Sequence, residues 1–484
     1  MASEPQRGNP NRAHLSLWDT ISIIIGIVIG AGIYETVPLI LQNVSGPLMG
    51  LGVWVLGGLL SLIGALCYAE LGSTYPRSGG DYVYLSRAYG SWAGFLFAWG
   101  QLIVLMTGSI GMMAYIFAHY ASTFWSFGPA SQYVYALGAV LVISAANIAG
   151  MVFGKRTQNV LSAAKVAGLL LILLCGLFWP ARGDAPAADA STAAAAGSFG
   201  FAMILVLYTY GGWNDAAFVV AEVKDKRNIP RALVLGTLAL TLIYVAVNGA
   251  YLLALGFHGA RESGAIAADV LARPFGQAGA RAMSVLVMIS ALGALNGLVY
   301  TGARVYATLG EDYRLFSRLA RWHPRLNSPA WSLAAQAAIT VGLMTLLGTT
   351  AGRSAINSAF GWVGMADVSW ETHGGFDTLL RCTAPVFWFF FLMTGLSLFV
   401  LRFRERERPR PFTVPLYPVL PLIFCATCGY MLYSAAAYAG GLIVIGLVPV
   451  AFGIFLYWLS LRTAGGVTEP RSGFPLPKTT EESR

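Results

Sequence analysis

Long apolar runs follow one another along most of this chain and are separated by short polar stretches. A helix of roughly 20 apolar residues is long enough to cross the hydrocarbon core of a bilayer. Runs of this kind lie near residues 17–41, 47–72, 91–121, 132–150, 158–181, 198–222, 231–257, 278–308, 329–348, 383–402, 412–436 and 440–462. The pattern predicts an all-α integral membrane protein with about twelve transmembrane helices.

Composition supports lipid as the main solvent of the chain. Only 11% of the 484 residues are charged and 56% are hydrophobic, whereas a soluble domain carries about 25% charged residues. The net charge of +9 does not indicate nucleic acid, because Lys and Arg gather in short clusters between the apolar runs. With the N-terminus inside, most clusters fall on the inner side. We therefore expect a multi-pass protein of the cell membrane with both termini cytoplasmic.

Two of the predicted spans are interrupted by glycine. The first carries Gly30 and Gly32 at its middle, and the sixth carries Gly211 and Gly212. Interrupted spans at matching positions indicate two inverted repeats with a substrate site at the bilayer midplane. The predicted organisation is listed here by residue range: tail 1–16, first repeat 17–181 (broken near 30–32), loop 182–197, second repeat 198–402 (broken near 210–214), two spans 403–462 and tail 463–484.

An unwound membrane helix exposes backbone groups that suit a zwitterion. The N–H groups at a helix N-terminus favour a carboxylate, and the carbonyls at a helix C-terminus favour an ammonium group. The alternative for the glycines is close helix packing.

Five segments resemble the amino acid–polyamine–organocation superfamily and, in particular, its L-type amino acid transporter branch. They are IGIVIGAGI, AELGSTYPRSGGDYVYLSRAYG, the pair YGGWN and EVKDKRNIPRAL, ALNGLVYTGARVYATLGEDYRLF, and RPRPFTVPLYPVLP. The resemblance covers about residues 15–460. It implies a LeuT-like five-plus-five inverted-repeat fold with two additional helices. It also implies sodium-independent amino acid transport by alternating access, as an exchanger or a proton-coupled symporter.

The resemblance also implies substrate-binding residues at the two breaks, namely Val28, Gly30, Ala31, Gly32, Tyr208, Gly211, Trp213 and Asn214. The amides of Ala31 and Gly32 are expected to meet the substrate carboxylate. The carbonyls of Val28, Tyr208 and Gly211 are expected to meet its amino group. The side chains of Tyr208, Trp213 and Asn214 would form or support the pocket, and Tyr208 is either an outer gate or a packing aromatic.

Ionisable or amide side chains inside a membrane are candidates for coupling and gating. Lys165 either replaces a bound cation, as the resemblance implies, or extends its ammonium to the interface. Glu35 and Asp215 flank the breaks and leave a cationic or a neutral substrate open. Glu222 is either part of a cytoplasmic gate or a surface ion pair. Asn296 either hydrogen-bonds towards span one or makes a structural contact between helices.

Other functions are less consistent with the sequence. It shows no catalytic motif such as HExxH or GxSxG, no metal-ligand spacing among its histidines and no cofactor motif, so we expect no enzyme, metal or cofactor. A polyamine or organic amine carrier remains the alternative to an amino acid transporter, and a non-transporting sensor is less favoured. Animal L-type transporters bind a heavy chain through a Cys in the outer loop between spans three and four. The corresponding loop here, ASTFWSFGPASQ, has no Cys, so no disulfide-linked partner is expected.

Overall fold

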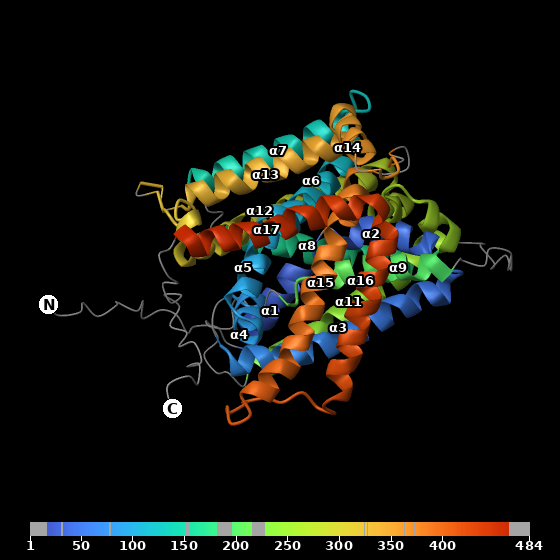
Figure 1. The fold of residues 1–484 in the computed structure, drawn as a ribbon. Helices are drawn as coiled ribbons and strands as arrows, with labels where there is room; N and C mark the ends of the chain where they lie inside the picture. Colours follow the sequence, from blue (N-terminus) through green and yellow to red (C-terminus); the bar gives the residue numbers. More distant parts are fainter. Residues whose placement is uncertain are drawn as a thin grey trace, which may run out of the picture. The chain divides into compact units, whose positions relative to one another are not determined.

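The computed structural model describes residues 17–30, 32–76, 79–150, 155–181, 196–214, 228–323, 325–326, 328–362, 364–368, 370 and 374–463. This part of the chain is built from helices (Figure 1). They are α1 (Leu17–Val28), α2 (Gly32–Gln42), α3 (Pro47–Thr74), α4 (Asp81–Tyr89), α5 (Ser91–Gly100), the π-helix η1 (Gln101–Leu105), α6 (Met106–Ser122), α7 (Ser131–Ile148), α8 (Lys155–Phe178), α9 (Ala196–Tyr210), α11 (Asn228–Glu262), α12 (Ile266–Asp312), η3 (Arg314–Phe316), α13 (Ala330–Gly348), α14 (Thr350–Trp362), α15 (Gly375–Arg404), α16 (Val419–Ala439), η5 (Gly440–Leu442) and α17 (Ile443–Thr463).

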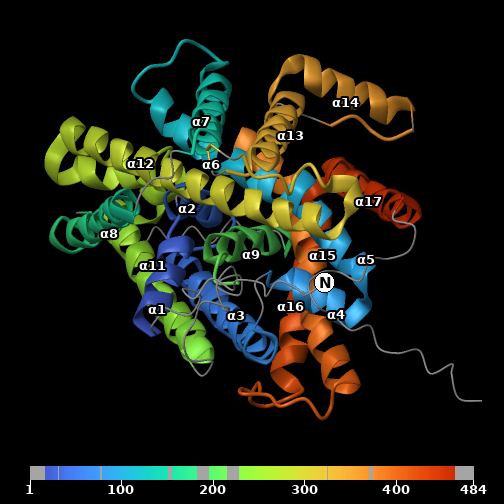
Figure 2. The ribbon, with the colours of Figure 1, turned by 90° about the vertical axis from the view of Figure 1, so that its left-hand side faces the viewer.

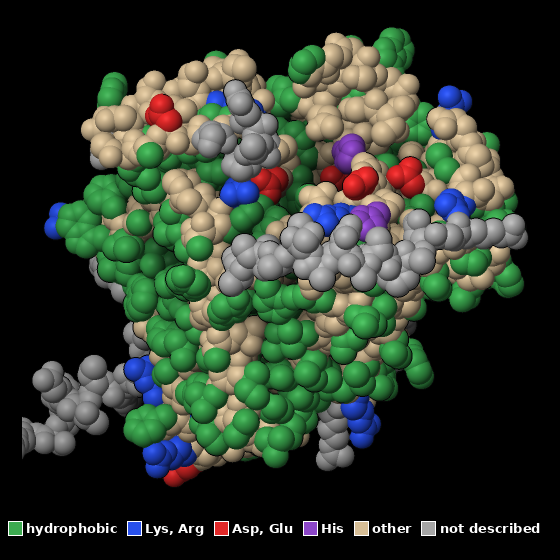
Figure 3. All heavy atoms as spheres, turned by 90° about the vertical axis from the view of Figure 1, so that its right-hand side faces the viewer, with side chains coloured by type: hydrophobic (Ala, Val, Ile, Leu, Met, Phe, Trp, Pro, Cys, Tyr) green, Lys and Arg blue, Asp and Glu red, His purple; other side chains and the backbone are tan. Residues whose placement is uncertain are grey.

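The helices have the length and hydropathy of membrane spans. Within the described residues, 8 helical stretches are long and apolar enough to cross a bilayer, and two shorter apolar helices cover Lys165–Phe178 and Phe199–Tyr210. Large apolar side chains are exposed on them, as at Leu242 (72%) and Tyr433 (72%), and hydrophobic side chains cover much of the face drawn in Figure 3. The chain is therefore a multi-pass helical membrane protein.

One predicted boundary is wrong. The eleventh span was expected to begin near residue 412, but α16 begins at Val419. Pro415 and Pro418 lie in between and Pro411 lies just before, and proline removes the backbone N–H that a helix interior needs. Residues 405–418 therefore connect α15 to α16 without forming an α-helix.

The chain folds into two compact units that interleave along the sequence. Unit 1 comprises Met1–Tyr89, Leu171–Arg273 and Phe391–Met431, and unit 2 comprises Gly90–Leu170, Pro274–Phe390 and Leu432–Arg484. Spans one, two, six and seven thus fall in unit 1, and spans three, four, eight and nine in unit 2. Because spans five positions apart share a unit, the partition is compatible with a five-span repeat, which stays a prediction.

In unit 1, close helix packing places the two interrupted spans beside α3 and α11. The main helix pairs are α3 with α11, α1 with α11, and α2 with α9, and Figure 2 shows these helices together. A Cβ built on Gly57 would meet Val206 and Tyr210, and one built on Gly58 would meet Thr241. The two glycines of α3 therefore let α9 and α11 approach the α3 backbone.

Candidate functional site

The first break interrupts the helix directly after Val28. Residues Ile29 and Gly30 are not helical, and α2 begins at Gly32. The N–H of Gly30 donates to the carbonyl of Val28 at 2.7 Å, which turns the chain out of the helical path. The carbonyl end of α1 and the N–H end of α2 are therefore both presented at this break.

At the position predicted for the second break, α9 ends at Tyr210 and a turn covers residues 211–214, and residues 215–227 lie outside the described part of the chain. The N–H of Gly211 donates to the carbonyl of Tyr208 at 3.0 Å, and a Cβ built on Gly211 would lie 2.9 Å from that carbonyl oxygen. Gly212 has a φ of 108°, which disfavours residues with a side chain. Its N–H donates to Oδ1 of Asn214 at 3.3 Å. Both glycines are therefore required by the turn itself.

The two breaks lie side by side within unit 1. A Cβ built on Gly32 would lie 3.5 Å from Oγ1 of Thr209 and 3.8 Å from Cε1 of Tyr208. The hydroxyls of Thr36 and Thr209 are 2.9 Å apart and share a hydrogen bond. The N-terminal turn of α2 therefore packs directly against the last turn of α9, although the two threonines are 173 residues apart in the sequence.

Tyr244 of α11 joins the two breaks. Its hydroxyl lies 2.9 Å from the carbonyl oxygen of Val28 and 3.1 Å from that of Thr209. Its ring is fully buried and packs edge-on against Trp54 and Tyr210, with centroids 5.6 and 5.1 Å away. The sequence analysis did not single out this residue. The only signal was a polar side chain in the middle of an apolar span, which by itself also fits a packing aromatic.

The arrangement brings opposite helix ends together. The N-terminus of α2 carries a partial positive charge, and the C-termini of α1 and α9 carry partial negative charges. Such a pair of environments accepts a carboxylate on one side and an ammonium group on the other. The carbonyl of Val28 already accepts from Gly30 and from Tyr244, so both its lone pairs are used here. It would have to release one bond before accepting an amino group.

Of the predicted pocket side chains, Tyr208 is partly exposed and lies closest to Gly32. Trp213 is only 4% exposed, and its ring packs edge-on against Tyr68, with centroids 5.2 Å apart. A Cβ on Gly64 of α3 would lie 2.8 Å from the same ring. Trp213 therefore anchors the turn against α3.

The remaining described candidates occupy different places. Asn214 is 8% exposed, and Glu35 lies in the first turn of α2, partly exposed. In unit 2, Lys165 of α8 is 5% exposed. Asn296 of α12 accepts a hydrogen bond from the amide of Asn147 on α7 at 2.8 Å, which is a contact between helices of unit 2. Three further candidates, Ala31, Asp215 and Glu222, lie outside the described residues.

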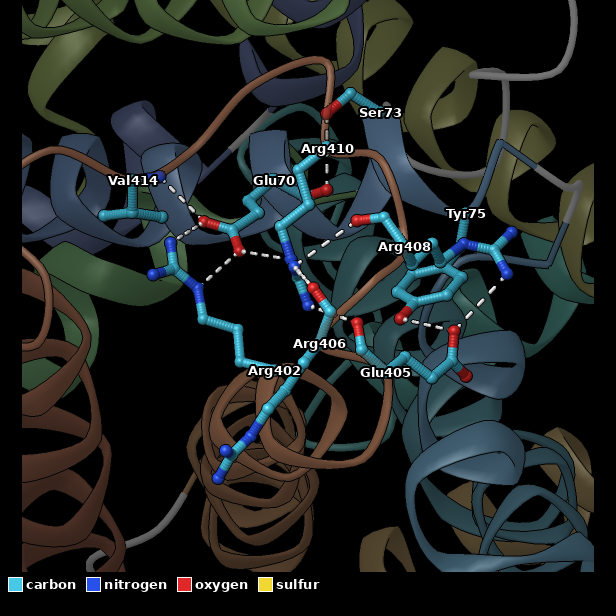
Figure 4. A network of polar contacts seen from close by, with 9 residues as sticks. All are labelled: Glu70, Ser73, Tyr75, Arg402, Glu405, Arg406, Arg408, Arg410 and Val414. Atoms are coloured by element: carbon cyan, nitrogen blue, oxygen red, sulfur yellow. Dashed lines mark hydrogen bonds and ion pairs between the residues drawn. The ribbon is translucent and has the colours of Figure 1, made fainter.

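A second polar cluster, which the sequence analysis did not identify, lies where α15 ends. Glu70 of α3 is 2% exposed and accepts two hydrogen bonds from Arg402 and one from the N–H of Val414, the last at 2.7 Å. Arg410 lies 3.5 Å from the same carboxylate. Figure 4 shows these groups converging on Glu70. Two of the segments that resemble the superfamily therefore meet here in three dimensions.

Beside it, Glu405 accepts hydrogen bonds from Arg87 at 2.5 and 3.1 Å and from the hydroxyl of Tyr75 at 3.2 Å. Arg408 lies 3.3 Å away. Burial alone would raise the pKa of the Glu405 carboxyl, but the hydrogen bonds and charges of Arg87 and Arg408 outweigh it and lower that pKa. The carboxylate therefore stays ionised.

A buried carboxyl also lies at the start of α4. Asp81 is 4% exposed and accepts a hydrogen bond from the hydroxyl of Tyr68 at 2.6 Å. Loss of hydration raises the pKa of Asp81 to about 6, and the hydrogen bond from Tyr68 offsets part of the effect. Since Tyr68 also packs against Trp213, this pair connects α4 to the turn after α9.

Comparison with known proteins agrees with this architecture. A family profile described as amino acid permease matches residues 15–460. The serine/threonine exchanger SteT of Bacillus subtilis (strain 168) is 28% identical over 457 residues, 92% of this chain and 98% of that protein. The human b(0,+)-type amino acid transporter 1 is 29% identical over 417 residues, covering 84% of this chain and 80% of that protein. The rabbit (Oryctolagus cuniculus) large neutral amino acids transporter small subunit 2 is 28% identical over 473 residues, covering 95% and 82%.

Proposed function

Because this chain belongs to the amino acid permease family, we propose that the two breaks of unit 1 form the binding site through which it exchanges neutral amino acids across the cell membrane. The family and the relatives are transporters, so the chain is a transporter and not an enzyme. All three relatives are named for amino acid substrates. An organic amine as the main cargo is therefore not favoured.

The observation that carries the proposal is the contact between Gly32 and the last turn of α9. It sets the positive end of α2 beside the negative ends of α1 and α9, joined by Tyr244 and by the pair Thr36–Thr209. In our proposal the amides of Ala31 and Gly32 bind the carboxylate, with Gly30 beside them. The carbonyls of Tyr208 and Gly211, and that of Val28 when it is released, bind the amino group.

We assign the side chain of the substrate to the region of Tyr208, because this aromatic residue borders Gly32 and is only partly buried. Trp213 and Asn214 support the turn that carries the site. Neutral substrates are proposed because SteT is named for serine and threonine, and the rabbit relative for large neutral amino acids. Glu35, Asp215 and Glu222 are then assigned to gating, and Asn296 to holding α12 in place.

Lys165 is proposed to make transport independent of sodium. Its side chain is buried, and because burial of an ammonium group in a membrane helix is costly, such a residue is a candidate for a functional role. The positive charge would take the place of a bound cation. Exchange fits a lysine that stays charged, and proton-coupled symport fits a lysine that gains and loses a proton. The Bacillus relative is named as an exchanger.

The proposed orientation places both termini in the cytoplasm. It rests on the clusters of Lys and Arg that fall on one side of the predicted spans. We also propose that the chain works without a disulfide-linked partner, because its five cysteines are all buried and free.

Counterflow in proteoliposomes tests the function. Vesicles loaded with an unlabelled neutral amino acid should take up the same labelled amino acid without a sodium gradient. A panel of neutral, cationic and amine compounds defines the substrate class. Uptake that requires sodium would contradict the role of Lys165. Uptake of amines lacking a carboxylate, at the rate of amino acids, would contradict the role of the α2 N-terminus.

A further inference from the structure

Five arginines follow one another at alternate positions where α15 leaves the proposed membrane region, from Arg402 to Arg410. Together with Arg87 they make six arginines, and Glu70, Glu405 and Glu407 are the acids of the same region. Six positive and three negative charges leave an excess of three. A basic cluster directly beyond a membrane helix is a common place for anionic lipid to bind.

Most of these arginines are paired with the carboxylates of Glu70 and Glu405. Arg402 and Arg410 face Glu70, and Arg87 and Arg408 face Glu405. Figure 4 shows these residues except Arg87. Since these ion pairs are partly buried, they fix the conformation of the segment between α15 and α16.

Arg404 and Arg406 are different. Both are exposed. Arg404 donates to the carbonyl of Ala88 at 2.8 Å, and the guanidinium of Arg406 lies 4.9 Å from the centre of the Phe403 ring. Neither makes an ion pair with a carboxylate among the described residues. In Figure 4, the side chain of Arg406 points away from Glu70 and Glu405. Two guanidinium groups therefore remain available to an anion.

Apolar side chains are exposed on the same segment. Phe403 is 71% exposed, Leu416 72% and Val419 53%. The guanidinium of Arg402 lies 3.8 Å from the centre of the Tyr417 ring. The part of the connecting segment that carries Leu416 therefore lies beside the end of α15. The surface therefore combines unpaired positive charge with apolar side chains at the end of two membrane helices.

We propose that Arg404, Arg406, Phe403 and Leu416 form a binding surface for an anionic phospholipid of the cytoplasmic leaflet. The two guanidinium groups bind the phosphate by charge-assisted hydrogen bonds, and Leu416 and Val419 contact the first part of the acyl chains. A soluble phosphate compound would leave these apolar side chains in water, whereas a lipid covers them. The assignment to the cytoplasmic leaflet rests on the proposed orientation of the termini. The lipid-binding surface itself does not depend on the transport function.

Native mass spectrometry and thermal unfolding of the full-length protein test the proposal. The probe is phosphatidylglycerol, compared with phosphatidylcholine. The wild type should retain bound phosphatidylglycerol and should unfold at a higher temperature with it than with phosphatidylcholine. The double variant Arg404→Gln with Arg406→Gln should bind it about tenfold more weakly, because two charge-assisted contacts are lost. In phosphatidylcholine this variant should unfold slightly below the wild-type temperature, because it loses the hydrogen bond from Arg404 to the carbonyl of Ala88.

The matched control is the double variant Arg314→Gln with Arg318→Gln, two exposed arginines that the same topology places on the cytoplasmic side. It removes the same charge and should bind phosphatidylglycerol like the wild type. Equal weakening in both double variants would reduce the effect to general surface charge and overturn the proposal. Stabilisation by inorganic phosphate as strong as that by the lipid would overturn it as well. Both measurements are made without substrate, so their failure leaves the transport proposal intact, and a failed counterflow assay leaves this one intact.

Discussion

The hydroxyl of Tyr244 donates a hydrogen bond to the backbone carbonyl of Val28 at 2.9 Å, at the residue where α1 ends. The same hydroxyl lies 3.1 Å from the carbonyl of Thr209, one residue before the end of α9. Its single proton is shared between the two oxygens. One side chain of α11 therefore satisfies a carbonyl at each of the two helix ends that border the proposed site.

Replacing Tyr244 by phenylalanine should weaken transport while the protein still folds. The ring that packs against Trp54 and Tyr210 is retained, but two buried carbonyls lose their shared donor. The Val28 carbonyl keeps its bond from the N–H of Gly30, so the loss falls mainly on the Thr209 carbonyl at the end of α9. An unsatisfied buried acceptor costs about 1–3 kcal/mol, which corresponds to a loss of about tenfold in substrate affinity. Counterflow at several substrate concentrations measures this loss.

Tyr210→Phe is the matched control. Tyr210 is equally buried, but its hydroxyl donates to the carbonyl of Trp54 within α3 at 2.9 Å, a carbonyl that belongs to neither break. The variant should lose similar thermal stability but keep its substrate affinity. If the two variants lose affinity equally, Tyr244 acts only through general packing.

Replacing Gly32 by a small residue and by a large one should affect substrate binding differently. An added methyl group would lie no closer than 3.5 Å to Thr209, so Gly32→Ala should fold and retain measurable binding. The side chain of Gly32→Leu extends further towards Thr209 and Tyr208 and should abolish binding of labelled amino acid. Gly52→Leu on α3, where nothing lies within 4 Å, should leave transport unchanged. Wild-type transport by Gly32→Leu would remove the proposed site.

Glu70→Gln should destabilise the protein more than Glu405→Gln. The side chain of Glu70 is 3% exposed and that of Glu405 is 24% exposed. Loss of one partner from a buried ion pair costs about 3–5 kcal/mol, whereas a partly exposed pair contributes about 1 kcal/mol or less. Melting temperatures in the same detergent provide the comparison. Equal shifts would mean that solvent screens the two carboxylates alike.

The pH dependence of stability should contain a contribution from Asp81. Folding raises the pKa of its carboxyl from 3.8 to about 6, so the folded state holds the proton more tightly than the unfolded state. Below pH 3.8 both states are protonated and there is no cost; the cost then grows until about pH 6 and stays constant above it. At about 1.4 kcal/mol for each pH unit, it reaches about 3 kcal/mol.

Asp81→Asn removes this titration and can still accept from the hydroxyl of Tyr68. The melting temperature of the wild type should therefore fall, relative to that of the variant, as the pH rises from about 4 to about 7. A constant difference between the two proteins across this range would show that Asp81 is ionised in the fold at all these pH values.

Much of the helical architecture follows from the chain alone because lipid imposes a simple rule. In a bilayer each backbone polar group must be satisfied within its own segment, so an apolar run of sufficient length becomes a helix. Gly30, Gly211 and Gly212 stood out for the same reason, since glycine weakens a helix wherever it lies. The prolines between Arg410 and Val419 also indicate locally that a helix does not form there, but the predicted start of the eleventh span did not take them into account.

Side-chain partners were decided only by tertiary structure. No local pattern connects Thr36 to Thr209, Tyr244 to Val28, or Glu70 to Arg402, because each pair lies at least 173 residues apart and depends on how helices pack. Packing also placed the ring of Trp213 against Tyr68. The sequence thus determined where the backbone is interrupted, because helix formation depends on neighbouring residues. The tertiary structure determined which side chains hydrogen-bond to the backbone groups at the breaks, because those partners come from other helices.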